Sequence, residues 1–319
     1  MFYDKNFKII DLPYGMVPLY SKLAHLQNKH ILLTSIPEYS EITEFPEMIE
    51  LVILYEWSGW TEIPDTTNST LPVIIFHNNF KYYKSNTDNC FYYPQWLFYV
   101  SNIIQESRPI TLDYLITSAN RNFNNGRPGK IYNYQLLKTK TYFNKILITK
   151  FKSIEPFEDN AILEIDADML ANFLLDYNEW DTLNYDQLDL VTSMGQIDLD
   201  VYSKSLFHLV AETRMAEQIL SEKTYKIFLV KQIPIMCAAQ HSVQHLRDIG
   251  FDMFDDIIDH TYDQISNWKE RITAMHKSLE GIMQLDHTLL LHQTSSRREF
   301  NKQHLLSKKL SNNILADIT

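Results

Sequence analysis

Short apolar runs that lack polar alternation constrain the fold of this chain most. Three of them lie in its first third, at residues 30–35 (HILLTS), 51–57 (LVILYEW) and 71–77 (LPVIIFH). Strands that are buried on both faces have this composition, and they occur in parallel sheets covered by helices. A helix-compatible stretch at 17–27 precedes the first run. The first part of the chain is therefore predicted to be an α/β domain.

A second alternation of strands and helices begins near residue 111. The predicted strands are 113–120 (strand, then loop), 144–151, 205–213 and 233–239, and the predicted helices are 127–139, 221–232 and 241–250. Residues 78–95 are predicted as loop, 152–202 as an acidic irregular insert, and 257–292 as a long helical segment. This order favours a doubly wound sheet in each half. We predict two domains, 1–110 and 111–319, with the boundary near the turn sequence SRPIT.

The charge and the cysteine content of the chain limit its possible ligands and its expected cellular location. The net charge of −11 argues against nucleic-acid binding over the whole surface, and the candidate exception is a basic run at 295–309. A basic amphipathic helix is the simpler explanation of that run. Cys90 and Cys237 form no CxxC pair, and Cys237 lies in an apolar run typical of a core thiol. With no signal peptide and no run of about 18 apolar residues, we expect a cytoplasmic protein without a membrane span, in the host cytoplasm if it is viral.

The sequence SEKTYK at 221–226 is the sharpest local feature. Ser221 is well placed to cap a helix, and the free N–H groups of a helix N-terminus attract phosphate. Lys223 and Lys226 could neutralise a diphosphate there, while Glu222 suits contact with ribose or sugar hydroxyls. The alternative is an ordinary capped surface helix, which this spacing alone also favours.

Two further sets of polar residues follow predicted strands. Asn120, Arg121 and Arg127 flank the loop after the strand at 113–120, where ligands of open α/β sheets bind and guanidinium groups can fork onto diphosphate oxygens. Glu212 ends the strand at 205–213 and would point into the same crevice. Arginines of a surface loop and a solvated strand-terminal glutamate are the alternatives.

Together these blocks carry a family resemblance. HLVAET, SEKTYK and IPIMCAAQHSVQHLRDIGF resemble the C-terminal segment of fucosyltransferase-like GT-B glycosyltransferases, and the spacing of Asn120, Arg121 and Arg127 is similar to their arginine-bearing loop. The blocks also resemble uncharacterised viral and bacterial proteins that share GFDMFDDIIDHTYDQI-like sequence after them. The resemblance covers roughly 111–275, and the N-terminal half has no visible match.

The resemblance implies two Rossmann-like domains facing a cleft, with a long helical C-terminal segment. It also implies a nucleoside-diphosphate sugar donor held by the C-terminal domain, without a metal or cofactor. Arg121, Lys223 and Lys226 would stabilise the leaving diphosphate, and Glu212 and Glu222 would hold hydroxyls. Family members often have Asn where this chain has Thr213, which leaves the donor identity open.

An inverting hexosyl- or pentosyltransferase also needs a base for the acceptor hydroxyl. Glu56 and His77 end predicted strands of the N-terminal, acceptor-side domain and are the candidates, although a strand-terminal Glu or His is commonly structural. The acceptor is a glycan, a protein or a modified DNA base, the last as in a phage-type DNA-base glycosyltransferase. The alternative function is a non-catalytic GT-B-like interaction or viral accessory protein.

Two patterns are typical of metal sites and are interpreted otherwise. Asp166 and Asp168 have Asp-x-Asp spacing, but they follow an apolar run and open a helix, so Asp166 is interpreted as a helix cap. His241 and His245 share a helix face without a clear third ligand. We therefore expect no metal site.

Overall fold

The structure is a computed structural model of the chain. It describes residues 2–3, 8–10, 29–35, 46–56, 71–77, 90–92, 95–101, 108–119, 128–149, 167–179, 197, 199–212, 215 and 218–307. The chain divides into two compact units, one made mainly of Met1–Tyr99 and the other of Val100–Ala216 and Leu220–Ser307. Among the described residues, no helix has the length and hydropathy needed to cross a membrane.

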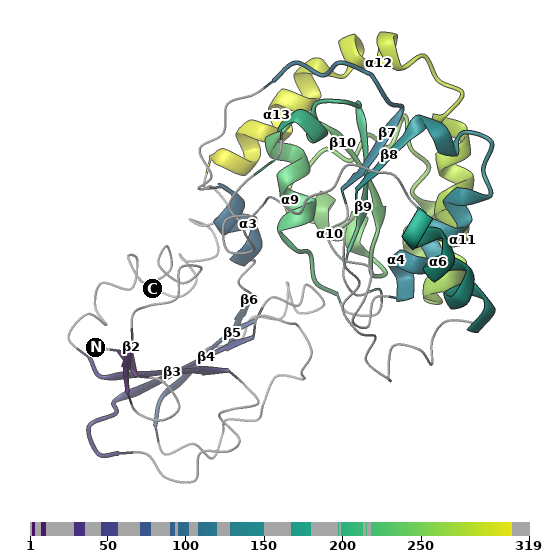
Figure 1. Ribbon diagram of the computed structural model, residues 1–319. Helices are drawn as coiled ribbons and strands as arrows, with labels where there is room; N and C mark the ends of the chain where they lie inside the picture. The colour runs from purple at the N-terminus through teal and green to yellow at the C-terminus, as the bar shows by residue number, and fades with distance from the viewer. Residues whose placement is uncertain are drawn as a thin grey trace. The chain divides into compact units, whose positions relative to one another are not determined.

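The first unit is built on one six-stranded sheet in the order β2-β1-β3-β4-β5-β6 (Figure 1). The strands are β1 Phe2–Tyr3, β2 Ile9–Ile10, β3 Ile31–Ser35, β4 Leu51–Glu56, β5 Val73–His77 and β6 Cys90–Tyr92. Only β1 and β2 pair antiparallel, and the other neighbouring pairs are parallel. Ile31, Leu32 and Val52 have no solvent exposure, as expected for strands covered on both faces.

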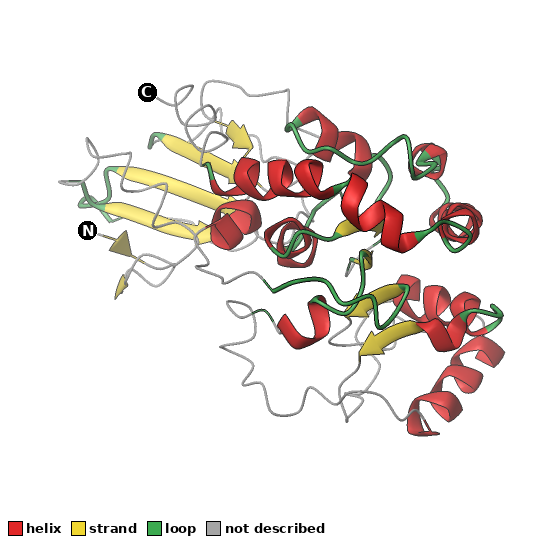
Figure 2. Cartoon of the chain, turned by 90° about the horizontal axis from the view of Figure 1, so that it is seen from above, coloured by secondary structure: helices red, strands yellow, loops and turns green. Residues whose placement is uncertain are grey.

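The central strands of this sheet set the positions of two residues singled out from the sequence. The long strands lie side by side in Figure 2, and β4 pairs with β5 in a register that places Glu56 opposite His77. Both are the last residues of their strands. The backbone therefore brings Glu56 and His77 to neighbouring positions at the carboxyl edge of the sheet.

The second unit contains a four-stranded, fully parallel sheet in the order β10-β9-β7-β8. Its strands are β7 Ile116–Ala119, β8 Ile146–Thr149, β9 Phe207–Ala211 and β10 Ile233–Cys237. Every residue of β8, β9 and β10 is buried, which explains their mostly apolar sequences, with Thr149 and His208 as buried polar exceptions.

Helices cover both faces of this sheet. They are α4 Pro128–Lys138, α6 Ala167–Glu179, α8 Leu199–Tyr202, α9 Glu222–Leu229, α10 Ser242–Asp248, α11 Trp268–Ile282, α12 His287–Gln293 and α13 Ser295–Leu306, with short 3-10 turns at Phe143–Lys145 and Thr261–Gln264 (η5). The helix α3, Gln95–Ser101, precedes β7. Figure 1 shows α4, α6 and α11 together on one side of the sheet and α9 with α13 on the other.

The prediction of an α/β fold with a largely parallel sheet in each half is confirmed, but three local predictions are wrong. The stretch 78–95 contains β6, and the insert 152–202 contains α8 in addition to α6, the helix expected at the Asp-x-Asp pair. The segment 257–292 is not one long helix, because Asn267 caps α11 and Asp286 caps α12 with their side chains, so new helices begin there. The predicted helix at 17–27 lies outside the described residues.

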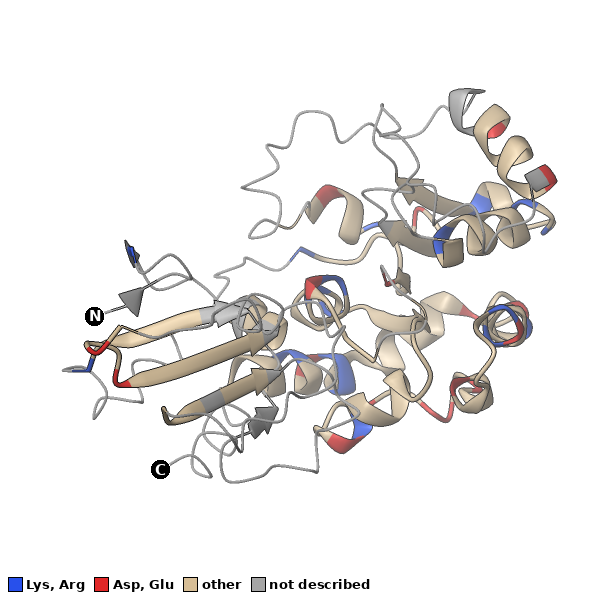
Figure 3. Ribbon diagram, turned by 90° about the horizontal axis from the view of Figure 1, so that it is seen from below, with Lys and Arg blue, Asp and Glu red and all other residues tan. Residues whose placement is uncertain are grey.

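The arginines of the basic run near the C-terminus make contacts within the domain. Arg297 donates to Asp252 and Asp256, and its guanidinium lies 4.6 Å from the centroid of Phe254. Arg298, only 7% exposed, donates to the carbonyl oxygen of Lys231 at 2.9 Å. Figure 3 shows Lys and Arg interspersed with Asp and Glu along the described helices. The simpler explanation, a helix packed against the domain, therefore holds for the part of this run that the structure describes.

Candidate functional site

The carboxyl edge of the second sheet gathers three helix starts. Because the strands are parallel, β7, β9 and β10 all end at this edge, and α4, α9 and α10 begin in the segments that follow them. Ligands of open α/β sheets bind beyond this edge, where backbone N–H groups of helix N-termini are available. The candidate site is built around the start of α9.

Ser221 caps α9 as the sequence predicts. Its backbone is extended (φ −91°), and its hydroxyl oxygen accepts a hydrogen bond from the backbone N–H of Lys223 at 3.3 Å. The Lys223 ammonium also donates to the same oxygen, at 3.1 Å. One serine oxygen thus orders both the first turn of the helix and the lysine side chain.

Glu212 lies directly after β9 and is only 2% exposed. Its Oε1 accepts hydrogen bonds from the Ser221 N–H at 3.0 Å and the Thr224 hydroxyl at 2.6 Å, and its Oε2 accepts one from the Ser221 hydroxyl at 2.6 Å. Its own N–H donates to the Cys237 carbonyl oxygen at 3.0 Å. Glu212 therefore joins the end of β10, through its backbone N–H, to the first turn of α9, through its carboxylate.

Glu222 and Lys223 form a partly buried ion pair. The Lys223 Nζ lies 3.2 Å from Glu222 Oε1, with side-chain exposures of 19% and 17%. Burial alone would raise the pKa of Glu222, but the charges of Lys223 and Lys226 outweigh it and lower this pKa to about 2. Lys226 is 6% exposed. Ser221 and Glu222 hold the Lys223 side chain against the helix, so it is only partly exposed.

Two buried cations at the same edge were missed in the sequence. Lys130 is 1% exposed in the first turn of α4, and Arg271 is 3% exposed on α11. Burial raises the pKa of Cys237 to about 12, and the charges of Arg271 and Lys130 act in the opposite direction, so both cations lie near the end of β10. A lysine in the first turn of a helix after a strand was the available signal for Lys130.

Arg271 binds backbone rather than a carboxylate. Its guanidinium donates to the carbonyl oxygens of Ala238 at 2.9 Å, Ile265 at 2.5 Å, Ser266 at 3.0 Å and Met215 at 2.6 Å. Met215 in turn lies against α4, where a Cβ on Gly129 would meet its Cγ at 2.2 Å. Arg271 therefore fastens the segments after β9 and β10 around the start of α4.

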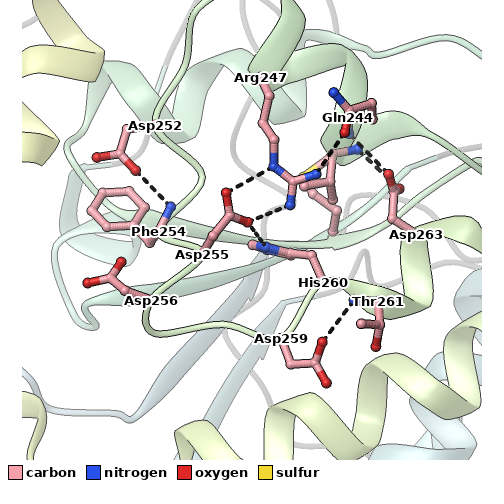
Figure 4. Close-up of polar contacts among 12 residues, drawn as sticks. Gln244, Arg247, Asp252, Phe254, Asp255, Asp256, Asp259, His260, Thr261 and Asp263 are labelled. Carbon is pink, nitrogen blue, oxygen red and sulfur yellow. Dashed lines mark hydrogen bonds and ion pairs between the residues drawn. The ribbon is translucent and has the colours of Figure 1, made fainter.

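The start of α10 is already occupied by a protein carboxylate. Asp263, from η5, accepts hydrogen bonds from the N–H groups of Val243 at 3.1 Å and Gln244 at 3.0 Å (Figure 4). His241 precedes the helix in a left-handed conformation (φ 66°). An exogenous anion would have to displace Asp263, so α10 contributes no phosphate site in this arrangement.

A second polar cluster is made of Arg247 on α10 and of Asp255 and His260 in the loop after that helix (Figure 4). Asp255 accepts hydrogen bonds from Arg247 Nε at 3.0 Å and NH2 at 2.5 Å and contacts His260 Nδ1 at 2.9 Å. Hydrogen bonding to Arg247 lowers the pKa of Asp255, while burial lowers the pKa of His260. This cluster fixes the loop 251–261.

The remaining residues singled out from the sequence lie partly inside and partly outside the described part of the chain. Glu56 and His77 lie at paired backbone positions of the first sheet. Outside the described residues lie Asn120, Arg121, Arg127 and Asp166. Asp168 is exposed in the first turn of α6, and among the described residues no group of three or more His, Cys, Asp or Glu side chains could hold a metal ion.

No protein-family model and no curated protein sequence matches the chain. Solved structures do match along its length. T4 phage BGT in complex with UDP and Mn2+ matches 99% of this chain and 98% of its own, with 8% identity and a TM-score of 0.45. An α,α-trehalose 6-phosphate synthase from Burkholderia multivorans matches 98% of this chain and 76% of its own, with 9% identity and a TM-score of 0.48. A glycosyltransferase from Rickettsia africae covers 94% of both chains, with 12% identity and a TM-score of 0.43.

Proposed function

We propose that the protein is a glycosyltransferase that moves a sugar from a nucleoside-diphosphate donor to an acceptor hydroxyl. The observation that carries this proposal is the start of α9, where two lysines and a glutamate surround a serine-capped helix N-terminus at the carboxyl edge of a parallel sheet. The positive end of the helix dipole and the two ammonium groups favour a diphosphate, and a carboxylate favours vicinal hydroxyls.

The proposed reaction needs positive charge at the leaving group. As the acceptor oxygen bonds to the anomeric carbon, the bond from that carbon to the diphosphate oxygen breaks and its electron pair stays on the diphosphate. Lys223 and Lys226 would stabilise this charge, together with Arg121 and Arg127, and Asn120 would bind the donor beside them. In this proposal the cationic side chains replace a divalent ion, so the reaction is metal-independent.

A base must take the proton of the acceptor hydroxyl if the configuration is inverted in one displacement. We propose Glu56 or His77 for this role, because the register of β4 and β5 brings these two ionisable residues to adjacent strand ends. The first sheet would then supply the acceptor side of the reaction.

Replacing Lys223 by Ala is expected to weaken binding of a nucleoside-diphosphate sugar by about 1.5–3 kcal/mol, or about 10- to 150-fold. Folding stability should change by less than about 1 kcal/mol, because the side chain is paired near the surface and Lys226 remains beside Glu222. Calorimetry with UDP, GDP, ADP and dTDP sugars measures the affinity, and thermal melts measure the stability.

Lys231→Ala is the matched control. Lys231 follows the other end of α9 and pairs with Glu299 at 3.3 Å, so its loss should leave donor affinity unchanged. Equal affinity of wild type and Lys223→Ala for every sugar nucleotide tested would contradict the proposed phosphate site.

Glu56→Gln and His77→Gln should separate catalysis from donor binding. The variant that lacks the base should lose about 100-fold or more in kcat, the usual contribution of general base catalysis, with little change in the donor Kd. Transfer rates at saturating donor, with a hydroxyl acceptor that wild type uses, measure this. If both variants turn over at the wild-type rate, the base lies elsewhere.

One structural observation bears on the class of acceptor. A modified DNA base was suggested in part by the basic run at 295–309, but Arg297 and Arg298 are engaged within the domain. We therefore favour a glycan or protein hydroxyl as the acceptor. Turnover of any sugar nucleotide, including slow hydrolysis lost in Lys223→Ala, separates an enzyme from a non-catalytic interaction protein.

A further inference from the structure

We propose that Glu212 is a positioning residue of the donor site rather than a ligand of the donor sugar or ribose. Its carboxylate sets the first turn of α9, and Glu222 is the carboxylate that meets ligand hydroxyls. This inference rests on the proposed function, because it assigns separate roles to the two glutamates of that site.

The hydrogen-bonding capacity of Glu212 is largely used inside the protein. A carboxylate offers about four acceptor positions. Three are taken by the Ser221 N–H, the Ser221 hydroxyl and the Thr224 hydroxyl, all within 3.0 Å. One acceptor position remains, but with only 2% of the residue exposed the carboxylate offers a sugar hydroxyl little access.

The contact with Ser221 continues to Lys223. A serine hydroxyl has one hydrogen to donate and two lone pairs with which to accept. The hydrogen goes to Glu212 Oε2 at 2.6 Å, which turns the lone pairs toward the backbone N–H and the ammonium of Lys223. The charge of Glu212 thereby fixes the donor direction of Ser221 and, through it, the lysine proposed to meet the diphosphate.

On the side away from Lys223, this chain of contacts begins at the parallel sheet. Glu212 follows the last residue of β9, and its N–H is hydrogen-bonded to the carbonyl oxygen of Cys237, the last residue of β10. The parallel pair β9–β10 thus serves as the fixed reference from which the first turn of α9 is positioned.

The nearly isosteric variant Glu212→Gln probes this role. Only donors face the carboxylate, so an amide NH2 must point at one of them, and Ser221 can adapt only by turning its hydrogen away. Donor affinity should fall at least tenfold in Glu212→Gln through misplacement of Lys223. Lower affinity alone does not distinguish positioning from direct binding. The ligand must therefore be changed as well as the protein.

The decisive measurement compares UDP, GDP and ADP with their 2′,3′-dideoxy forms on wild type, Glu212→Gln and Glu222→Gln. If Glu212 acts by positioning, removing the ribose hydroxyls weakens binding by the same factor, within about twofold, in wild type and Glu212→Gln. In Glu222→Gln that factor should shrink toward one. If the factor collapses in Glu212→Gln instead, Glu212 binds the hydroxyls directly and the inference is overturned.

A second readout does not depend on any ligand. Backbone amides of Ser221–Thr224 should exchange hydrogen at least tenfold faster in Glu212→Gln and in Ser221→Ala than in wild type, while amides of β10 stay protected. Glu222→Gln is the control and should leave the exchange of the Ser221, Lys223 and Thr224 amides unchanged. Unchanged exchange in Glu212→Gln would overturn the positioning role. Failure of wild type to bind any nucleotide, with faster exchange in Glu212→Gln, would refute the donor site and keep Glu212 as a structural anchor of α9.

Discussion

Lowering the pH from 7 to 5 is expected to reduce the free energy of unfolding by about 5 kcal/mol, through three buried histidines. Burial lowers the pKa of each of His208, His245 and His276 to about 3. An unfolded histidine titrates near 6.5, so between about pH 6.5 and 3 the unfolded chain binds protons that the folded protein excludes. Stability from these groups is therefore fully present above pH 6.5 and falls as the pH decreases.

The size of this loss follows from linkage. Each histidine contributes a slope of up to about 1.4 kcal/mol per pH unit, so three contribute about 4 kcal/mol per unit in the middle of the window. Domains are stable by about 5–15 kcal/mol in total, so acid unfolding near pH 5 is expected. Urea unfolding followed by circular dichroism at pH 7, 6 and 5 measures the slope.

One variant and one control test whether the buried histidines cause this pH dependence. His276→Gln can retain the contact that His276 Nε2 makes with Asn133 at 3.0 Å, and it should reduce the slope by about a third. His292→Gln alters an exposed residue of α12 and should leave the slope unchanged. A stability that is flat between pH 7 and 5 would contradict a neutral, buried state of these histidines.

Replacing Arg271 by Met should cost about 3–5 kcal/mol of folding free energy, the second large effect. The variant keeps an apolar stem but leaves the carbonyl oxygens of Ala238, Ile265, Ser266 and Met215 without their charged donor. The free energy of unfolding of Arg271→Lys should lie between those of wild type and Arg271→Met. One ammonium group cannot reach all the carbonyl oxygens that a guanidinium group reaches. Chemical denaturation at pH 7 provides the comparison.

Arg247→Met is the matched control for this prediction. Arg247 is also an arginine of a helix on this unit, but its side chain is 28% exposed and its partner Asp255 is 54% exposed. Such a solvated pair contributes about 1 kcal/mol or less. Equal losses in the two variants would mean that Arg271 stabilises the domain as an ordinary surface charge rather than as a buried anchor of backbone.

The sequence predicts those elements whose signals are local. The apolar runs at 51–57 and 233–239 became β4 and β10, because burial on both faces selects an unbroken apolar pattern. The cap at Ser221 was also predictable from the local sequence, because the start of a helix needs a hydrogen-bond acceptor at that position. The strand β6 was not, because three residues paired in parallel with β5 leave no periodic pattern.

The partners of the site residues could not be predicted, because they are set by tertiary contacts. Glu212 lies directly after its strand, close to the expected strand end, but its hydrogen bonds with Ser221 and Thr224 depend on how α9 returns to the sheet. Lys130 and Arg271 have sequence surroundings typical of surface residues, although both are buried. Their burial depends on Met215 and on the ends of β9 and β10 rather than on neighbours in sequence.

The helix α9 is held at both ends by distant parts of the chain. Glu212 binds its first turn, and α13 packs along it, with Arg298 bonded to the Lys231 carbonyl oxygen and Glu299 paired with Lys231. Eight residues form a helix that is marginal in isolation, about 12 Å long, so nearly all of its stability is tertiary. The first turn of α9 and the C-terminal helix consequently belong to one cooperative unit, and loosening either one lowers the free energy needed to open the other.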